Sequence, residues 1–300
     1  MNKTEILKAL TAAFRKEFSD GLGFREPTYA KVAMTIPSTT STNTYAWLSA
    51  FPRMKEWVGE RTLNKLGKQA MSIENKLFES TVSVPRTDIE DDQVGIYRSI
   101  MKQAGVSAAE LPDDLVWPLL AKGKATLCYD GQNFFDTDHV WYENVDGTGT
   151  TKNMSNLTTG TDADAPTWYV IDDTNVLKPL VYQERTKPEF ETKFDPSKSD
   201  KVFLEDVYLY GIRARGNAGF GLWQLAHMVE KTNLTKAALA KVVKEMKELK
   251  TDGGYDLKIR PSLLVVPPAL EETARKILEQ TIQDGTNNIW AGRLKLHGEY

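Results

Sequence analysis

The tract "YLYGIRARGNAGFGLWQLAH", residues 208–227, concentrates four glycines and two arginines, residue types that often surround phosphate groups. A phosphate loop also needs a lysine that reaches the terminal phosphates and a hydroxyl that binds magnesium. Gly211 and Gly216 have the required spacing, but Asn217 and Ala218 stand where the lysine and the hydroxyl are needed. The last three glycines run in the order GxxGxG, which is not the GxGxxG order of dinucleotide sites. The tract therefore does not predict a nucleotide site.

The segment "FDTDH" places Asp136, Asp138 and His139 close together in the chain. Carboxylate oxygens and imidazole nitrogens are metal ligands, so the segment could hold a cation. No second histidine or acidic pair follows at ligand spacing, however, and Asp-rich turns use the same residue types for hydrogen bonds to their own backbone. We interpret the segment as a turn and predict no metal site.

A second acidic stretch, "DIEDD" from Asp88, could bind calcium, but it lacks the spacing and the glycine of an EF-hand loop. It precedes a helical pattern, and carboxylates at a helix N-terminus are stabilising against the helix dipole. Helix capping is therefore favoured over calcium binding.

Familiar nucleophile and hydrolase motifs do not occur in the chain. The single cysteine, Cys128, has apolar neighbours and no adjacent base, which is typical of a buried small side chain. The three histidines, at 139, 227 and 297, show no HExxH spacing, and no GxSxG elbow is present. Acidic pairs that cleave glycosides leave no sequence signature because their pairing is spatial. The sequence predicts neither a catalytic residue nor a cofactor.

Composition sets wider limits on function. The chain has 300 residues, 41% hydrophobic and 26% charged, which is typical of one or two globular domains. A net charge of −3 gives no overall field that would attract a polyanion, although a local basic patch stays possible. One cysteine, no secretory signal and no apolar run long enough for a membrane span indicate a soluble protein made inside a cell.

The N-terminal third shows helical and strand patterns joined by polar segments. Apolar side chains at 7, 10, 14 and 18 predict a helix over residues 4–18, which Asp20-Gly21 ends. The Ser/Thr-rich residues 36–47 indicate an extended arm or linker. Alternation over 77–84 predicts a strand with Phe78, Val82 and Val84 on one face. Asn75-Lys76 then predicts a hairpin turn within a projecting two-stranded feature.

A helix is expected to start near residue 93 and to end at Gly105, with a capping box at Ser107 and Glu110 starting a shorter one. Strand patterns return from Trp168, and a helix over 234–249 carries lysines mixed with glutamates, which indicates a solvated face. Residues 255–283 predict a strand followed by a helix that begins at a proline.

Six segments of the chain, read together, resemble the major head subunit of Mu-like phages and prophages. They are "FPRMKEWVGERTLNKL", "NKLFESTVSVPRTDIEDDQVGIY", "LCYDGQNFFDTDH", "KPLVYQER", "YLYGIRARGNAGFGLWQLAH" and "LLVVPPALEETARKIL". They occur in family order from about residue 46 to the end of the chain. The resemblance implies an α+β fold of the Hong Kong 97 capsid type.

The resemblance also implies a division of the chain. Residues 1–45 would form the N-terminal helix and arm, and 58–86 the extended β-hairpin loop. Residues 46–57 and 87–130 would form the peripheral domain with its spine helix. Residues 131–283 would hold the axial domain with strands of the peripheral domain, and 284–300 a last peripheral strand.

In function, the resemblance implies a structural protein without enzymatic activity or cofactor. Copies would assemble as hexamers and pentamers into the icosahedral shell of a virion, formed in the host bacterial cytoplasm. The implied partners are other copies, portal, scaffold, maturation protease and, without sequence specificity, the packaged double-stranded DNA. No membrane partner is expected. The implied mechanism includes a later expansion of the shell.

We predict inter-subunit contacts at six residues. These are Asn75, Lys76, Phe78, Glu79, Arg213 and Arg215. The two arginines could pair with carboxylates of an adjacent subunit, or they could belong to a solvent-facing strand edge. The glycines of 208–227 are expected to allow tight turns after a strand, and the aromatic side chains to be buried.

Two other functions are alternatives. One is the shell of a cellular nanocompartment with the same fold. The other is a nucleotide- or metal-dependent enzyme that uses "GIRARGNAGFG" or "FDTDH".

Overall fold

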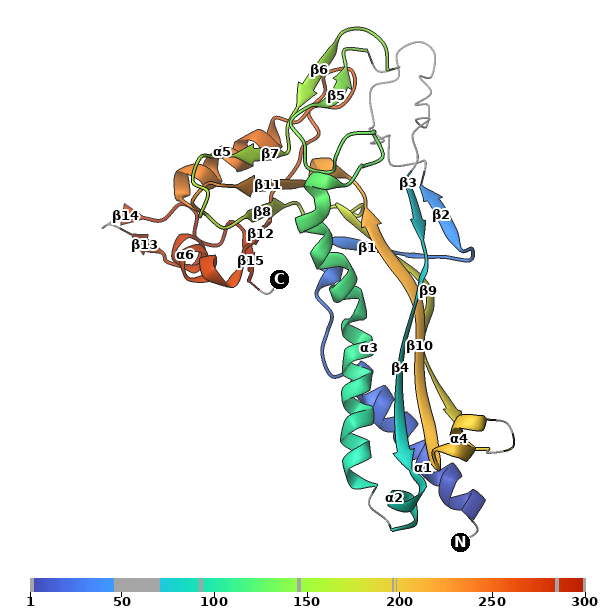
Figure 1. The fold of residues 1–300 in the computed structure, drawn as a ribbon. Helices are drawn as coiled ribbons and strands as arrows, with labels where there is room; N and C mark the ends of the chain where they lie inside the picture. Colours follow the sequence, from blue (N-terminus) through green and yellow to red (C-terminus); the bar gives the residue numbers. More distant parts are fainter. Residues whose placement is uncertain are drawn as a thin grey trace.

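A computed structural model describes residues 3–45, 71–91, 94–144, 147–195, 197, 199–283 and 286–298. Its elements form an elongated stalk joined to a compact sheet domain (Figure 1). No described helix has the length and apolar character needed to cross a membrane. The α-helices are α1 (Lys3–Leu22), α2 (Arg86–Glu90), α3 (Gly95–Lys122), α4 (Asp200–Leu204), α5 (Lys236–Lys247) and α6 (Pro268–Leu278), with 3-10 turns η1 (Tyr29–Lys31), η3 (Gly123–Ala125) and η4 (Trp223–Leu225).

The strands are β1 (Ala33–Pro37), β2 (Thr42–Tyr45), β3 (Met71–Glu74), β4 (Lys76–Pro85), β5 (His139–Tyr142), β6 (Thr151–Met154), β7 (Leu157–Thr159), β8 (Trp168–Ile171), β9 (Leu180–Lys193), β10 (Val207–Phe220), β11 (Ala226–Glu230), β12 (Leu263–Val265), β13 (Ile282–Gln283), β14 (Thr286–Asn287) and β15 (Lys295–His297).

The stalk is built on a four-stranded sheet in the order β1-β9-β10-β4. Strands β9 and β10 are antiparallel and have 14 residues each, so they extend roughly 45 Å. Strand β4 pairs antiparallel with β10, and β1 pairs parallel with the start of β9. Helices α1 and α3 lie along this sheet (Figure 1).

The helical stripe predicted for the N-terminus is confirmed. Leu10, Phe14 and Phe18 of α1 are buried against α3 and the sheet, and the Phe14 ring meets Tyr210 edge to face at 4.9 Å. The described residues 36–45 of the segment predicted as an extended arm or linker have extended backbone, but they are paired in strands and do not form a free linker. They contribute to β1 and β2.

The prediction that a helix ends at Gly105 is wrong, because α3 continues through this residue to Lys122. Gly105 allows α1 to cross α3 at close range. A Cβ atom on it would lie 2.2 Å from the backbone oxygen of Phe18 and 3.0 Å from the Cα of Gly21. The missing side chain therefore serves helix packing and does not end the helix.

The predicted hairpin at Asn75-Lys76 is also wrong. Strand β3 pairs with β2, whereas β4 pairs with β10, so the two strands on either side of Asn75 have different partners. The predicted face of β4 is confirmed, because Val84 is buried and Phe78 and Val82 are half-buried. Residues 58–70, which belong to the predicted extended loop, lie outside the described residues.

The sheet domain contains a second, mixed sheet in the order β15-β12-β8-β11-β7. Strands β8 and β12 are buried at every position, and α5 and α6 pack against the sheet. The helix expected over 234–249 is α5, whose N-cap Thr235 accepts a hydrogen bond from the Ala238 N–H. The expected strand and proline-initiated helix are β12 and α6. The range 284–300 contributes β15 to this same sheet, parallel to β12.

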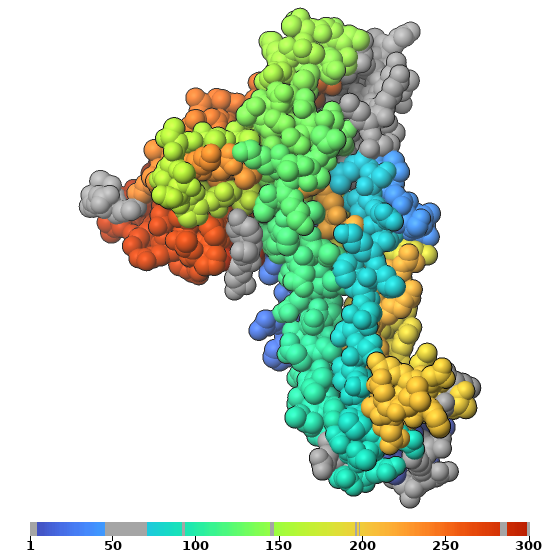
Figure 2. Space-filling model, in the orientation of Figure 1, coloured from blue at the N-terminus to red at the C-terminus, as the bar shows by residue number. Residues whose placement is uncertain are grey.

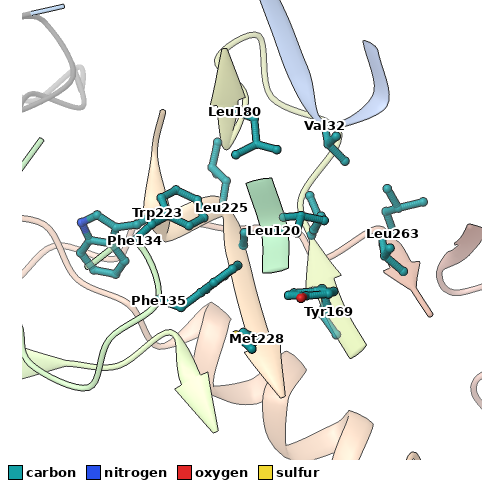
Figure 3. Close-up of a cluster of buried hydrophobic side chains, with 14 of the residues drawn as sticks. Val32, Leu120, Phe134, Phe135, Tyr169, Leu180, Trp223, Leu225, Met228 and Leu263 are labelled. Atoms are coloured by element: carbon teal, nitrogen blue, oxygen red, sulfur yellow. The ribbon is translucent and has the colours of Figure 1, made fainter. Parts of the chain in front are cut away.

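One large hydrophobic core joins the sheet domain to the upper end of the stalk. Leu120 at the end of α3 and Leu180 at the start of β9 meet Phe134, Tyr169 and Leu225 there (Figure 3). A smaller, separate core fills the space between the lower stalk sheet and helices α1 and α3.

Candidate assembly surface

The stalk sheet has two unequal faces. Along β10 the burial alternates, with Tyr208, Tyr210 and Ile212 buried toward α1 and α3. The intervening side chains of β10, among them Arg213 and Arg215, are only half-buried on the opposite side. We call this opposite side, carried by β4, β10 and β9, the outer face of the stalk.

Charged residues alternate across the outer face. Arg213 is the register partner of Glu79 on β4 and of Glu189 on β9, so a carboxylate-bearing residue flanks it on each side. Side chains opposite each other in antiparallel strands have Cβ atoms about 5 Å apart, within reach of an arginine. Arg215 is opposite Leu77 and Thr186 and has no such acidic neighbour. Arg215 therefore has no carboxylate directly opposite it, and Glu79 is its diagonal neighbour on β4.

The structure does not gather all six predicted contact residues on one surface. Glu79, Arg213 and Arg215 share the outer face. Lys76 and Phe78 pair in register with Gly216 and Ala214, whose side of β10 is buried, so these two residues belong to the inner side.

Asn75 is a junction between segments of its own chain. Its side-chain amide donates to Ser38 Oγ at 2.9 Å and to the Thr40 carbonyl at 2.8 Å. Its carbonyl oxygen accepts from Gln183 Nε2 at 2.8 Å. Both polar ends of this side chain are thus used within the subunit.

Gln183, which our sequence reasoning missed, fastens the β2–β3 ribbon to the stalk. Its Oε1 accepts a 2.7 Å hydrogen bond from the Tyr45 hydroxyl, and its Nε2 donates to the Ile73 carbonyl at 3.1 Å. Burial raises the pKa of Tyr45, which keeps this hydroxyl protonated as a donor. Gln183 is fully buried, and the one available signal was a glutamine in the otherwise apolar run "PLVYQ".

Gly216 and Gly219 allow close approach of neighbouring segments, and the expectation of tight turns is wrong for the glycines within β10. A Cβ on Gly219 would lie 2.6 Å from side-chain atoms of Met71 and Ile73, so a larger residue would force these side chains of β3 to shift. A Cβ on Gly216 would lie 2.7 Å from the Gln183 carbonyl. Neither glycine has a positive φ. The predicted burial of the aromatic side chains in this tract is confirmed.

The residues considered for catalysis or metal binding have structural partners. Burial raises the pKa of the Cys128 thiol, and its Sγ donates to the Gly221 carbonyl. Asp136 accepts the Thr137 N–H at 2.7 Å, as expected for an Asp-rich turn. His139 is buried, bonds through Nδ1 to Asp130 at 2.6 Å and stacks on Trp223 at 3.8 Å. Within the described ranges, no group of three or more acidic, histidine or cysteine side chains is arranged to hold a metal ion.

Comparison with known proteins places this geometry in a family. A family model described as "Mu-like prophage major head subunit gpT" matches residues 7–298. The chain is 44% identical over 283 residues to the Mu-like prophage FluMu major head subunit of Haemophilus influenzae, across 93% of this chain and 90% of that protein. It is 42% identical over 296 residues to the major capsid protein of Escherichia phage Mu, across 97% of this chain and 96% of that protein.

Two solved structures are similar along nearly the whole chain. The subunit of the bacteriophage JBD30 procapsid has a TM-score of 0.89 and 45% identity, and the match covers 100% of this chain and 99% of that one. The subunit of the JBD30 capsid has a TM-score of 0.73 and 35% identity, with 92% and 90% covered. The chain thus belongs to the Mu-like major head subunit family: it is a major capsid protein with the Hong Kong 97 type of fold, a structural protein and not an enzyme.

Proposed function

We propose that many copies of this chain associate as hexamers and pentamers into a closed icosahedral shell that encloses double-stranded phage DNA. The observation that carries the proposal is the end-to-end likeness to a procapsid subunit, with a TM-score of 0.89 over 100% of the chain. The resemblance extends the proposal to assembly in the host bacterial cytoplasm, with portal, scaffold and maturation protease as partners.

The proposed domain assignment follows the two sheets. The sheet domain would be the axial domain, and the stalk the peripheral domain with α3 as its spine helix. The β2–β3 ribbon, tied to the stalk by Gln183, would be the base of the extended loop. This assignment moves the loop toward the N-terminus relative to the predicted range 58–86.

The outer face of the stalk is the inter-subunit contact that we propose. Arg215 supports it most directly, because no acidic residue lies opposite it in its own sheet. A carboxylate of a neighbouring subunit would balance its charge. Arg213 contributes less to such a contact, because Glu79 and Glu189 flank it. We therefore favour the inter-subunit contact for Arg215 and the strand pairing within the subunit for Arg213.

We further propose that the described conformation is the one that precedes expansion of the shell. The likeness to the JBD30 procapsid subunit exceeds that to the JBD30 capsid subunit, at TM-scores of 0.89 and 0.73. The JBD30 capsid also occurs decorated with minor capsid protein trimers, and we extend that class of partner to this chain.

Negative-stain electron microscopy of the purified protein, with and without its scaffold, tests the proposal. We expect closed particles of uniform size. A protein that stays monomeric under all capsid-forming conditions, or particles that enclose a cellular cargo enzyme in place of phage DNA, would contradict it.

A further inference from the structure

A basic groove of about 490 Å³ lies where α5 ends and the chain turns back through residues 250–260. Its charged residues are Lys247, Glu248, Lys250, Asp256, Lys258 and Arg260. These are four cations and two acids, a net charge of +2. The groove is therefore locally basic on a chain whose net charge is −3.

Both acids of the basic groove already have a partner within the chain. Glu248 lies 3.7 Å from Lys244, and Asp256 forms an ion pair with Lys250. The side chains of Lys247, Lys258 and Arg260 have no carboxylate partner among the described residues, and all three are exposed. Three positive charges thus remain unbalanced in one groove.

A second groove, of about 330 Å³, has the opposite charge. It lies between residues 25–28 and α3 and is lined by Arg25 and by Glu26, Glu110, Asp113 and Asp114. We call these residues the acidic face. With one cation and four acids, its net charge is −3. The segment between α1 and η1, which contains residues 25–28, passes beside α3 (Figure 1).

Two of the four carboxylates in the acidic face are used inside the subunit. Asp113 accepts the N–H groups of Thr28 and Tyr29, at 2.9 and 2.6 Å, and Glu110 pairs with Arg25 at 3.0 Å. Glu26 and Asp114 have no cation partner among the described residues. Burial, together with the nearby Glu110 and Asp113, raises the pKa of Asp114. A positive charge brought to this face would relieve that repulsion.

We propose that the basic groove of one copy receives the acidic face of a second copy, as a head-to-tail contact between neighbouring subunits of the shell. The inference rests on the proposed function. The two surfaces share no residue, so each copy can use both at once. Different, complementary patches are what a head-to-tail contact requires, and such contacts close into rings.

A second copy explains more of the structure than a nucleic acid does. A phosphate backbone could occupy the basic groove, but it would leave the unbalanced carboxylates of the acidic face without a role. A neighbouring subunit accounts for both surfaces with one interaction. Opposite charges across an interface also set register and exclude wrong partners.

Charge reversal tests the proposal. Lys258→Glu with Arg260→Glu makes both surfaces acidic, and Glu26→Lys with Asp114→Lys makes both basic. Each variant alone should lose at least about tenfold in shell yield, because like charges meet at every contact. An equimolar mixture of the two variants should recover most of the shell yield, because alternating copies restore opposite charges at every contact of a hexamer and at all but one contact of a pentamer. Recovery also shows that both variants are folded.

The matched control is Lys241→Glu with Lys276→Glu, which changes the charge by the same amount. Each lysine already lies beside a glutamate of its own helix, Glu245 or Glu272, and none of these residues lines the basic groove, so shells should form as in the wild type. Normal shells from either reversed variant alone would overturn the proposal, even if those shells retained less DNA. A mixture of the two variants that formed no shells would also overturn it. Absence of shells from the wild-type protein would instead contradict the proposed function.

Discussion

The stalk and the sheet domain bury their sheets to very different extents. In the sheet domain, β8 and β12 are buried at every residue, within a core that also includes side chains of α5, α6 and the end of α3. In the lower stalk, α1 and α3 cover one face of the sheet, and nine buried residues form the core. The β4 edge of the stalk lies at the surface beside α3 (Figure 2).

This difference indicates where assembly can act. A small core covers little apolar surface and is marginally stable alone, whereas a sheet buried on both faces is self-sufficient. Binding to a neighbour stabilises whatever it covers. We therefore expect the stalk to gain most of its stability from neighbouring subunits, and the sheet domain to contribute most to the stability of the free subunit.

The largest expected effect is a loss of packing between α1 and α3 in the stalk, with the sheet domain still folded. Gly105→Ala places a Cβ 2.2 Å from the Phe18 backbone oxygen, so α1 must move away from α3. We expect a loss of about 3 kcal/mol in the stalk, at the upper end of overpacking costs. Amide hydrogen exchange should show α1 deprotected and β8 unchanged. Gly95→Ala, where a Cβ meets nothing within 4 Å, is the control, and equal deprotection in both variants would refute the explanation.

A second substitution should destabilise only the β2–β3 ribbon. Gln183→Leu removes the acceptor of the Tyr45 hydroxyl and the donor to the Ile73 carbonyl, which leaves buried polar groups unsatisfied. We expect a loss of about 2 kcal/mol in urea unfolding and faster exchange in β2 and β3. Asn217→Ala, which removes an exposed hydrogen bond to the Glu74 carbonyl and a local one from the Ala218 N–H, should cost less than half as much. Equal costs would mean that Gln183 is not the main fastening.

Acid should weaken the sheet domain, because His227 is buried on β11 in that domain. Burial, with a smaller contribution from the nearby Lys241, lowers the pKa of His227 from 6.5 to about 3. Glu245 lies 3.8 Å away and would favour the charged ring, but burial dominates and Thr158 holds the same nitrogen at 2.8 Å.

The unfolded chain therefore binds a proton that the folded domain does not, and stability falls as the pH drops from about 6.5 towards 3. Between pH 7 and pH 5 this contributes a loss of about 2 kcal/mol. Urea unfolding at the two pH values should show a smaller difference in His227→Gln. An unchanged difference would assign the acid sensitivity to other groups.

The smallest effect distinguishes the two arginines of the outer face. Arg213→Gln leaves Glu79 and Glu189 without the cation between them, so the free subunit should lose about 0.5 kcal/mol. Arg215→Gln should not change the unfolding free energy of the subunit but should lower shell yield. Thermal unfolding and sedimentation of shells separate the two outcomes. A stability loss in Arg215→Gln alone would reverse our assignment.

The sequence predicted those elements whose signals are local. The apolar stripes of α1 and α5 and the proline start of α6 follow from spacing within one element, so they could be read directly. The pairing of β3 with β2 could not be predicted in this way, because strand pairing depends on contacts with residues that are distant in the sequence. Gly105 was misread for the same reason, since the cause of that glycine lies on α1.

The six contact residues remain a prediction, and the strand pairing shows only which of them lie on the same face. Glu79, Arg213 and Arg215 do share one face, as alternation within strands suggests. The hydrogen bonds of Asn75 within the subunit could not be predicted, because its partners, Ser38, Thr40 and Gln183, are far away in the sequence. Gln183 itself was missed because a single buried polar residue has no periodic signal.

Amide hydrogen exchange of the free subunit and of assembled shells, measured side by side, tests the central claim most directly. We expect β4 and β10 of the stalk to become strongly protected on assembly, while β8 and β12 are protected to the same degree in both states. Equal protection of β4 and β10 in both states, or gains confined to the sheet domain, would contradict the claim that neighbouring subunits complete the stalk.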